Sequence, residues 1–215
     1  MRLPRELDKV EVRVLGALLE KEQTTPDYYP LTLNSLVAAC NQRSNRDPVM
    51  DLSAPEVEAA LDRLHREVLV WPTQGSRVQR WRHSIDRRWE LEPAGKAVVT
   101  LLLLRGAQTV GELRSRSERM HAFASIDEVA EALELLAAGQ EPLVVLLSRR
   151  PGQKEARWTH LVEGRPVEPV AEAAMPQPAP RGPGLAERVE NLEQAVAELS
   201  EQVRQLAERF GSLRE

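Results

Sequence analysis

The chain repeats one of its own segments, and this repeat limits what it can fold into. Residues 69–83, LVWPTQGSRVQRWRH, align without a gap with residues 146–160, LLSRRPGQKEARWTH. The identical positions are Leu69 with Leu146, Gly75 with Gly152, Arg80 with Arg157, Trp81 with Trp158 and His83 with His160. Upstream, SAPEVEAALDRL at 53–64 aligns with SIDEVAEALELL at 125–136. One structural unit is therefore used twice, and the two histidines are expected to share a structural role.

Each copy predicts three helices followed by a hairpin. SAPE and SIDE are S-x-x-E capping boxes, and the apolar residues after each follow a helical period. Two β-prone runs around a glycine-bearing turn then predict a hairpin. Two further helical segments precede each copy, one of them opened by the box TVGE at 109–112. This order predicts two tandem winged helix-turn-helix domains, at residues 1–90 and 91–163, in an α+β, mainly α fold.

The composition changes after these domains. Residues 164–184 contain six prolines and three glycines, which predicts an extended linker. Residues 185–215 then place apolar side chains at alternating steps of four and three, which is typical of a parallel two-stranded coiled coil and predicts a homodimer. The seam positions are Leu185, Val189, Leu192, Val196, Leu199, Val203, Leu206, Phe210 and Leu213. The alternative is a single amphipathic helix that folds back on its own domains.

The residue types needed for catalysis are not gathered in any familiar motif. The sequence has no glycine-rich phosphate loop, no H-E-x-x-H, no Cys/His metal set and no G-x-S-x-G, and its four histidines are scattered. We therefore expect no enzymatic activity, no cofactor and no metal. The single cysteine, Cys40, lies in the apolar run LVAAC and is expected to be a buried small side chain in a reducing compartment.

The protein is expected to be cytoplasmic and without a membrane anchor. Its first residues lack the apolar region of a signal peptide. The longest apolar stretch, AVVTLLLL at 97–104, is much shorter than the ~20 residues needed to span a bilayer.

Any contact with double-stranded DNA would have to come from local charge, because the net charge of the chain is −4. Residues 74–88 carry five arginines and one aspartate on the first predicted hairpin and its exit, a patch able to neutralise phosphates. The candidate DNA contacts are Arg77, Arg80, Arg82, Arg87 and Arg88 there, Arg63 and Arg66 on the third helix, and Arg43 and Arg46 in the turn before it.

The third helices of the two copies differ in charge. The first carries Glu58 and Asp62 near its start and bases only toward its end. The second carries Asp127, Glu128, Glu131 and Glu134 and no basic residue, so it would repel DNA and is expected to face solvent or another protein.

The segment NQRSNRDPVM, residues 41–50, lengthens the predicted turn between the second and third helices. Its Asn, Asp and Ser side chains can satisfy the loop's own backbone. Arg43 and Arg46 could reach outward to phosphate or to a partner's carboxylates. They could equally turn inward to Asp47, Asp51 or the last carbonyls of the preceding helix, and the sequence leaves both open.

Two motifs, EKE-x-TTPD-x-YPL-x-LN and ACNQ-x-SNRDPVM, carry a resemblance to the YceH-like bacterial proteins of unknown function. The resemblance covers about residues 7–162. It implies a tandem winged-helix fold and says little about activity, because a regulatory role within that family is an analogy from fold.

Together these observations favour a non-enzymatic, dimeric, DNA-binding or transcription-regulator-like protein whose first winged helix contacts DNA and whose second contacts another protein. The alternative is an adaptor or scaffold that uses winged-helix surfaces to bind proteins without touching DNA.

Overall fold

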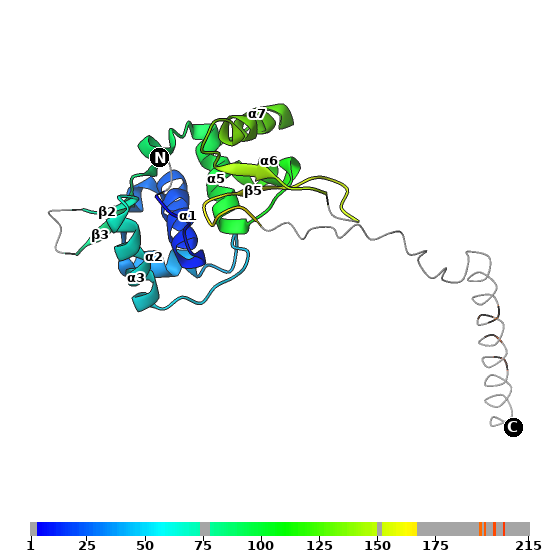
Figure 1. The fold of residues 1–215 in the computed structure, drawn as a ribbon. Coiled ribbons are helices and arrows are strands. Elements are labelled where there is room, and N and C mark those ends of the chain that lie inside the picture. The colour runs from blue at the N-terminus through cyan, green and yellow to red at the C-terminus, as the bar shows by residue number, and fades with distance from the viewer. Residues whose placement is uncertain are drawn as a thin grey trace, which may run out of the picture. The chain divides into compact units, whose positions relative to one another are not determined.

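The computed structural model describes residues 4–73, 78–149 and 152–166, together with residues 194, 196, 200 and 204. The chain divides into two units, Met1–Glu168 and Pro169–Glu215. The first unit combines helices with two small antiparallel sheets, so the predicted α+β, mainly α class is confirmed (Figure 1).

The first half of this unit begins with a long helix and ends in a three-stranded sheet. Its elements are α1 (Lys9–Thr24), a 3₁₀ turn (Pro26–Tyr28), β1 (Leu31–Thr32), α2 (Leu33–Cys40), α3 (Ala54–Arg66), β2 (Val70–Pro72) and β3 (Arg80–His83). The strand order is β1-β3-β2, with both pairs antiparallel. The hairpin β2–β3 was predicted, whereas the two-residue strand β1 was not.

The second half repeats this order after the short helix α4 (Ile85–Trp89). Its elements are α5 (Pro93–Arg105), α6 (Val110–Ser117), α7 (Ile126–Ala137), β4 (Val144–Leu146) and β5 (Trp158–His160). The repeat extends to the strand register. Trp81 pairs with Leu31 in the first half, and Trp158 forms a β-bridge with Gln108 at the matching place in the second.

The arginine that precedes each of these tryptophans has the same task. Arg80 donates to the carbonyl of Pro30 at 3.0 Å, and Arg157 donates to the carbonyl of Ala107 at 2.9 Å. Each arginine therefore ties its hairpin to the residue before the bridging position. This shared contact gives a structural reason for the recurrence of Arg-Trp in the sequence.

The helix starts follow the predicted capping boxes, with one correction. Ser53 with Glu56 and Thr109 with Glu112 form reciprocal boxes. In the second S-x-x-E sequence, Ser125 accepts from the amide of Glu128, but the Glu128 carboxylate binds the amide of Ala124 instead of that of Ser125. That start is therefore capped without a reciprocal box.

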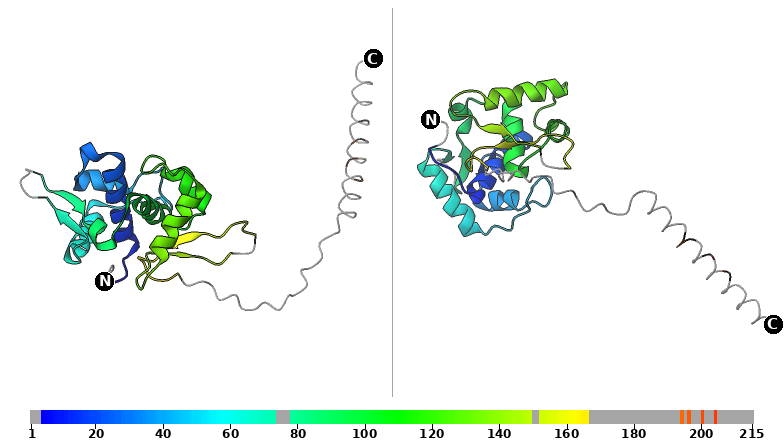
Figure 2. Two further views of the ribbon diagram at one scale, coloured as in Figure 1. Left: turned by 90° about the horizontal axis from the view of Figure 1, so that it is seen from above. Right: turned by 45° about the vertical axis from the view of Figure 1, so that its right-hand side comes forward.

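The two halves meet along α1 and α5, the most extensive helix contact in the unit (Figure 2). Both helices have long buried runs, and the unit's main hydrophobic cluster draws side chains from both halves. Leu7 also donates from its amide to the carbonyl of Val162 at 2.8 Å, which joins the start of the unit to its end. The division into domains at residues 90 and 91 stays a prediction.

Burial in this core explains the longest apolar stretch of the sequence. Residues 97–104 of α5 are all buried within the unit. Within the described residues, no helix combines the length and the apolar character needed to cross a bilayer.

The predicted linker and coiled coil lie almost wholly outside the described residues. Of the nine seam positions, only Val196 is described; it is helical and 61% exposed. Leu185, Val189, Leu192, Leu199, Val203, Leu206, Phe210 and Leu213 lie outside the described part of the chain. Dimerisation through this seam stays a prediction.

The close approach of α1 and α5 depends on a glycine. A Cβ atom added to Gly16 would lie 2.9 Å from Cδ2 of Leu104 and 3.1 Å from Cβ of Leu103. We expect Gly16→Leu to lower the free energy of unfolding by about 1–3 kcal/mol or more, because it overpacks this contact. Denaturant unfolding followed by circular dichroism measures the effect.

The matched control is Gly111→Ala in α6, where the nearest atom to an added Cβ is Thr109 Oγ1 at 4.0 Å. This variant should be neutral or up to ~1 kcal/mol more stable, since alanine favours a helix. Equal losses in the two variants would contradict the packing argument.

Candidate functional site

The nine arginines proposed from sequence as DNA contacts do not form one surface. Arg77 lies outside the described residues, as does the side chain of Arg87. Of the remaining seven, Arg46 is buried and Arg63, Arg80 and Arg88 make contacts within the fold. The exposed members are Arg43, Arg66 and Arg82.

Arg46 points inward, so it is withdrawn from the candidate DNA contacts. Its side chain has no exposed surface and binds the Glu20 carboxylate through two nitrogens, at 2.6 and 3.0 Å. It also donates to the carbonyl of Ala39 in α2. Of the alternatives open from sequence, a carbonyl of the preceding helix is therefore correct, and the carboxylate partner comes from α1 instead of from Asp47 or Asp51.

A second buried arginine also holds this loop. Arg13 of α1 donates to the carbonyls of Cys40 and Pro48, at 3.0 and 2.6 Å. Asn41 closes the loop by exchanging two hydrogen bonds with the backbone of Leu52, both at 2.8 Å. Loop 41–50 is thus fixed by charged side chains of α1. Burial raises the pKa of the Cys40 thiol to about 12, as expected of an inert buried cysteine.

Arg63, Arg80 and Arg88 also serve the fold. Arg63 of α3 binds Glu11 at 2.9 Å and Asp8 at 2.7 Å, which joins α3 to the start of α1. Arg88 donates to the carbonyl of Glu67 at 2.6 Å, and Arg80 makes the carbonyl contact described above. A phosphate would have to compete with these partners.

The outer face of α3 is acidic where it meets the hairpin. A hollow of about 670 Å³ lies between α3, the start of α2 and the hairpin, and its lining includes Glu58, Asp62 and His65 from α3. The two carboxylates oppose the approach of phosphate to this face. Arg66, at the end of α3, is the exposed base of this helix.

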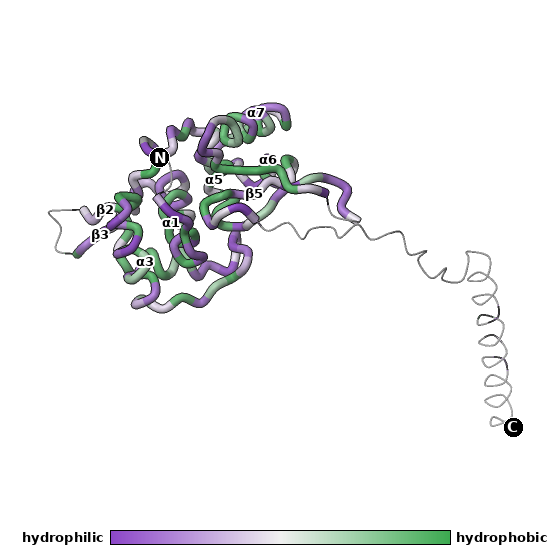
Figure 3. The backbone as a smooth tube through the Cα atoms, in the orientation of Figure 1, coloured by the Kyte–Doolittle hydropathy of each residue, from purple (hydrophilic) through white to green (hydrophobic). Residues whose placement is uncertain are grey.

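Helix α7 presents carboxylates together with exposed apolar side chains. Leu135 is 76% exposed and Ile126 is 51% exposed. Asp127, Glu131 and Glu134 are exposed on the side of the helix that carries Leu135, and an open hollow of about 750 Å³ runs along this side. Ile126 lies against a different hollow, beside α6. Hydrophobic and hydrophilic residues alternate along α7 in Figure 3. We call Leu135 and these three carboxylates the α7 face.

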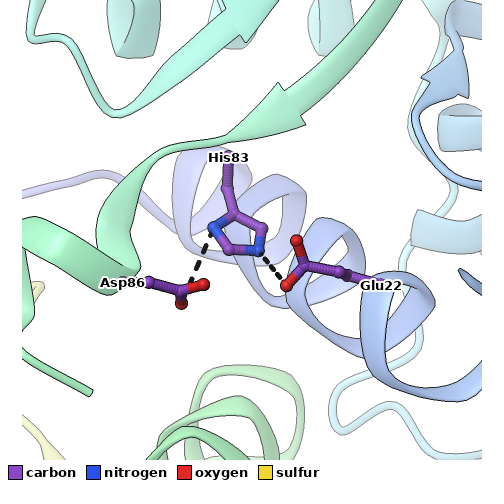
Figure 4. A group of neighbouring side chains, drawn as sticks. All are labelled: Glu22, His83 and Asp86. Atoms are coloured by element: carbon purple, nitrogen blue, oxygen red, sulfur yellow. Dashed lines mark hydrogen bonds and ion pairs between the residues drawn. The ribbon is translucent and has the colours of Figure 1, made fainter. Parts of the chain in front are cut away.

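A polar cluster that was not predicted lies where α1, β3, α4 and α5 meet. The buried His83 ring contacts Glu22 through Nε2 at 2.8 Å, and its Nδ1 lies 4.0 Å from Oδ1 of Asp86 (Figure 4). Lys96 donates to both carboxylates. Burial alone would raise the pKa of Glu22, but the hydrogen bonds from His83 and Lys96 outweigh it and lower this pKa to about 2.

Glu22, His83 and Asp86 are of the donor types that bind divalent metals, and one possible ligand atom from each lies within 4.8 Å of the others. However, the Lys96 ammonium already contacts both carboxylates and supplies the positive charge that a metal ion would bring. We therefore interpret the cluster as an ion-pair network that connects the two halves.

The equivalent histidine of the second half lacks this network. His160 is buried on β5, and burial lowers its pKa to about 4. Its Nδ1 has no hydrogen-bond partner in the described structure, and its Nε2 lies 3.6 Å from Glu163. The shared buried position of the two histidines is confirmed, while their surroundings differ.

Comparison with known proteins identifies close relatives along most of the chain. A family model described as "Protein of unknown function, DUF480" matches residues 7–153. A UPF0502 protein of Geobacter sulfurreducens is 50% identical over 194 residues, covering 89% of each chain. A UPF0502 protein of Acidovorax sp. is 46% identical over 214 residues, covering 96% of this chain and 95% of the relative. The resemblance to a bacterial family of unknown function is confirmed, and these names state no activity.

Substitution of two arginines of loop 41–50 should change stability by very different amounts. We expect Arg46→Met to lower the free energy of unfolding by about 3–5 kcal/mol, because the buried Glu20 carboxylate would lose both hydrogen bonds from Arg46 and keep only the Lys21 ammonium, 3.3 Å away. The matched control, Arg43→Met, removes an exposed side chain from the same loop and should change stability by less than about 0.5 kcal/mol. Denaturant unfolding of both variants compares them, and similar losses would show that Arg46 does not hold the loop.

Proposed function

We propose that this chain, which belongs to the DUF480 family of proteins of unknown function, is a non-enzymatic adaptor that binds another protein through the α7 face. The observation that carries this proposal is Leu135, an apolar side chain that is 76% exposed between carboxylates. Its buried single cysteine fits an adaptor of the reducing cytoplasm.

The order of elements supports a winged-helix interpretation of both halves. In this interpretation α3 and α7 occupy the place of the third helix, the element that winged-helix proteins commonly present to a ligand. The acidic charge of α7 argues against DNA as its ligand, since phosphates would be repelled. An exposed leucine among these carboxylates instead suits an amphipathic helix laid along the face.

Charge complementarity defines the partner as a basic segment with apolar anchors. Asp127, Glu131 and Glu134 make no ion pair with any other described residue, so their charges are available. The chain's own residues 185–215 are a poor occupant, because their seven glutamates and four arginines give a net charge of −3. A dimer formed through the predicted seam would present two α7 faces to its partner.

A designed peptide tests the proposal directly. A labelled amphipathic helix with leucines at helical spacing and lysines on either side should bind the full chain, whereas the same peptide with glutamates in place of lysines should not. Leu135→Asp should weaken binding by at least about tenfold, because a buried leucine anchor contributes ~1.5–3 kcal/mol. Fluorescence anisotropy measures both affinities.

The matched control is Val49→Asp, which alters a 56% exposed apolar residue of loop 41–50, outside the α7 face. It should leave peptide affinity unchanged. No binding of the basic peptide, or equal binding by wild type and Leu135→Asp, would refute a docking role for the α7 face.

DNA binding by the first half remains a second candidate, favoured by the exposure of Arg66 at the end of α3 and Arg82 on β3. It is narrower than the nine-arginine surface predicted from sequence. If it operates, affinity for a random-sequence duplex should fall steeply with salt, and Arg66→Ala and Arg82→Ala should each reduce the log–log salt slope by about 1. A titration at several salt concentrations measures this slope. An absence of binding at low salt would exclude DNA binding and leave the adaptor role as the remaining candidate.

A further inference from the structure

A cleft of about 410 Å³ lies between the two halves of the first unit, next to loop 41–50. Its walls come from the end of α1, loop 41–50, α5 and the end of α6. The loop is held against α5, because the amide of Asp47 donates to the carbonyl of Leu104 at 2.9 Å (Figure 1). The segments EKE-x-TT and NQ-x-SN, from the two motifs that carry the family resemblance, thus meet at one cavity.

Cations outnumber anions around this cleft. Its lining includes Lys21, Arg43, Arg116 and Arg119. Arg43 and Arg119 are exposed and make no hydrogen bond or ion pair with any other described residue. Arg116 is held in place by a hydrogen bond to Gln108 at 2.8 Å.

A neighbouring arginine also has a lowered pKa, mainly because its side chain is partly buried. Arg105 lies beside the cleft and donates to Asn45 Oδ1 at 3.2 Å. Burial lowers the pKa of Arg105, and the charges of Arg116 and Arg46 lower it further.

The negative groups of the cleft already have partners. The Glu20 carboxylate is bound by Arg46 and lies 3.3 Å from Nζ of Lys21. The last carbonyls of α1 would also repel an anion, but those of Glu20 and Lys21 accept hydrogen bonds from the hydroxyls of Thr24 and Thr25, at 2.8 and 3.2 Å. A surplus of positive charge therefore faces the cavity.

We propose that this cleft binds the phosphate group of a small molecule of the nucleotide type. Guanidinium groups match phosphate oxygens in charge and geometry, and Arg43 and Arg119, which have no partner among the described residues, are available for this contact. The volume lies in the range of small-molecule sites, and Leu101, Leu104 and Met120 give it an apolar floor on which a base could rest. A concave site of this size suits a compact ligand better than a rigid duplex.

Such a ligand would connect the two halves. Arg43 belongs to the first half and Arg119 to the second, so one phosphate bound by both would bridge them. The proposal is independent of the adaptor role, since the α7 face is formed by other residues.

Titration calorimetry of the full chain with inorganic pyrophosphate and with ADP, at constant ionic strength, tests the site. We expect saturable binding by the wild type. The double variant Arg43→Gln/Arg119→Gln should weaken it by about a hundredfold, tenfold for each lost charged hydrogen bond. The matched control, Arg66→Gln/Arg82→Gln, removes the same charge outside the cleft and should bind as the wild type does.

Thermal unfolding shows whether the cleft variant still folds, as expected because neither arginine makes a hydrogen bond or ion pair in the part of the chain that the structure describes. Arg43→Lys/Arg119→Lys keeps the charge and should recover part of the affinity. No saturable binding at millimolar pyrophosphate or ADP would overturn the proposal, as would equal weakening in the cleft and control variants. A duplex that displaces pyrophosphate and itself depends on Arg43 and Arg119 would assign the site to nucleic acid, which also overturns it.

Discussion

Helix α1 has to bury three charged side chains while it packs against α5, and the arrangement of the first half follows from this requirement. A buried charge is tolerated only when it is paired or hydrogen-bonded. Glu11 binds Arg5 and Arg63, Arg13 binds the carbonyls of Cys40 and Pro48, and Glu20 binds Arg46. The N-terminal segment, α3 and loop 41–50 are therefore positioned by α1. These contacts account for the polar composition of loop 41–50.

The repeated sequence predicted much of the fold because it records local requirements. Capping serines, helical spacing and the turn between β-prone runs are properties of neighbouring residues, so the predicted helices and hairpins agree closely with those observed. The recurrence of Arg80 and Trp81 as Arg157 and Trp158 also has a local cause, the tie between each hairpin and its bridging residue. The appearance of Arg80 in both copies was a sign of a structural role, although sequence reasoning counted it as a DNA contact.

What sequence reasoning missed depends on partners far apart in the chain. Lys96 joins Glu22 across 74 positions, and Arg46 meets Glu20 across 26. No spacing rule connects such residues, because tertiary packing decides which faces meet. The cation-rich cleft was missed for the same reason: Arg43 and Arg119 come together only when α6 packs near loop 41–50. Charge counting alone treats a buried arginine and an exposed one as equal.

The first helices of the two halves, α1 and α5, differ in the side chains that they bury. α1 keeps charged side chains around its buried face, whereas nearly every side chain of α5 from Ala97 to Leu104 is apolar and covered. A repeated domain can often fold on its own, because each copy has its own polar, solvent-exposed surface. In the second half, residues 97–104 of α5 have no such surface, because all of them are buried. Removing either half would expose the apolar surface that is now buried between α1 and α5, so each half depends on the other to stay folded and free of aggregation.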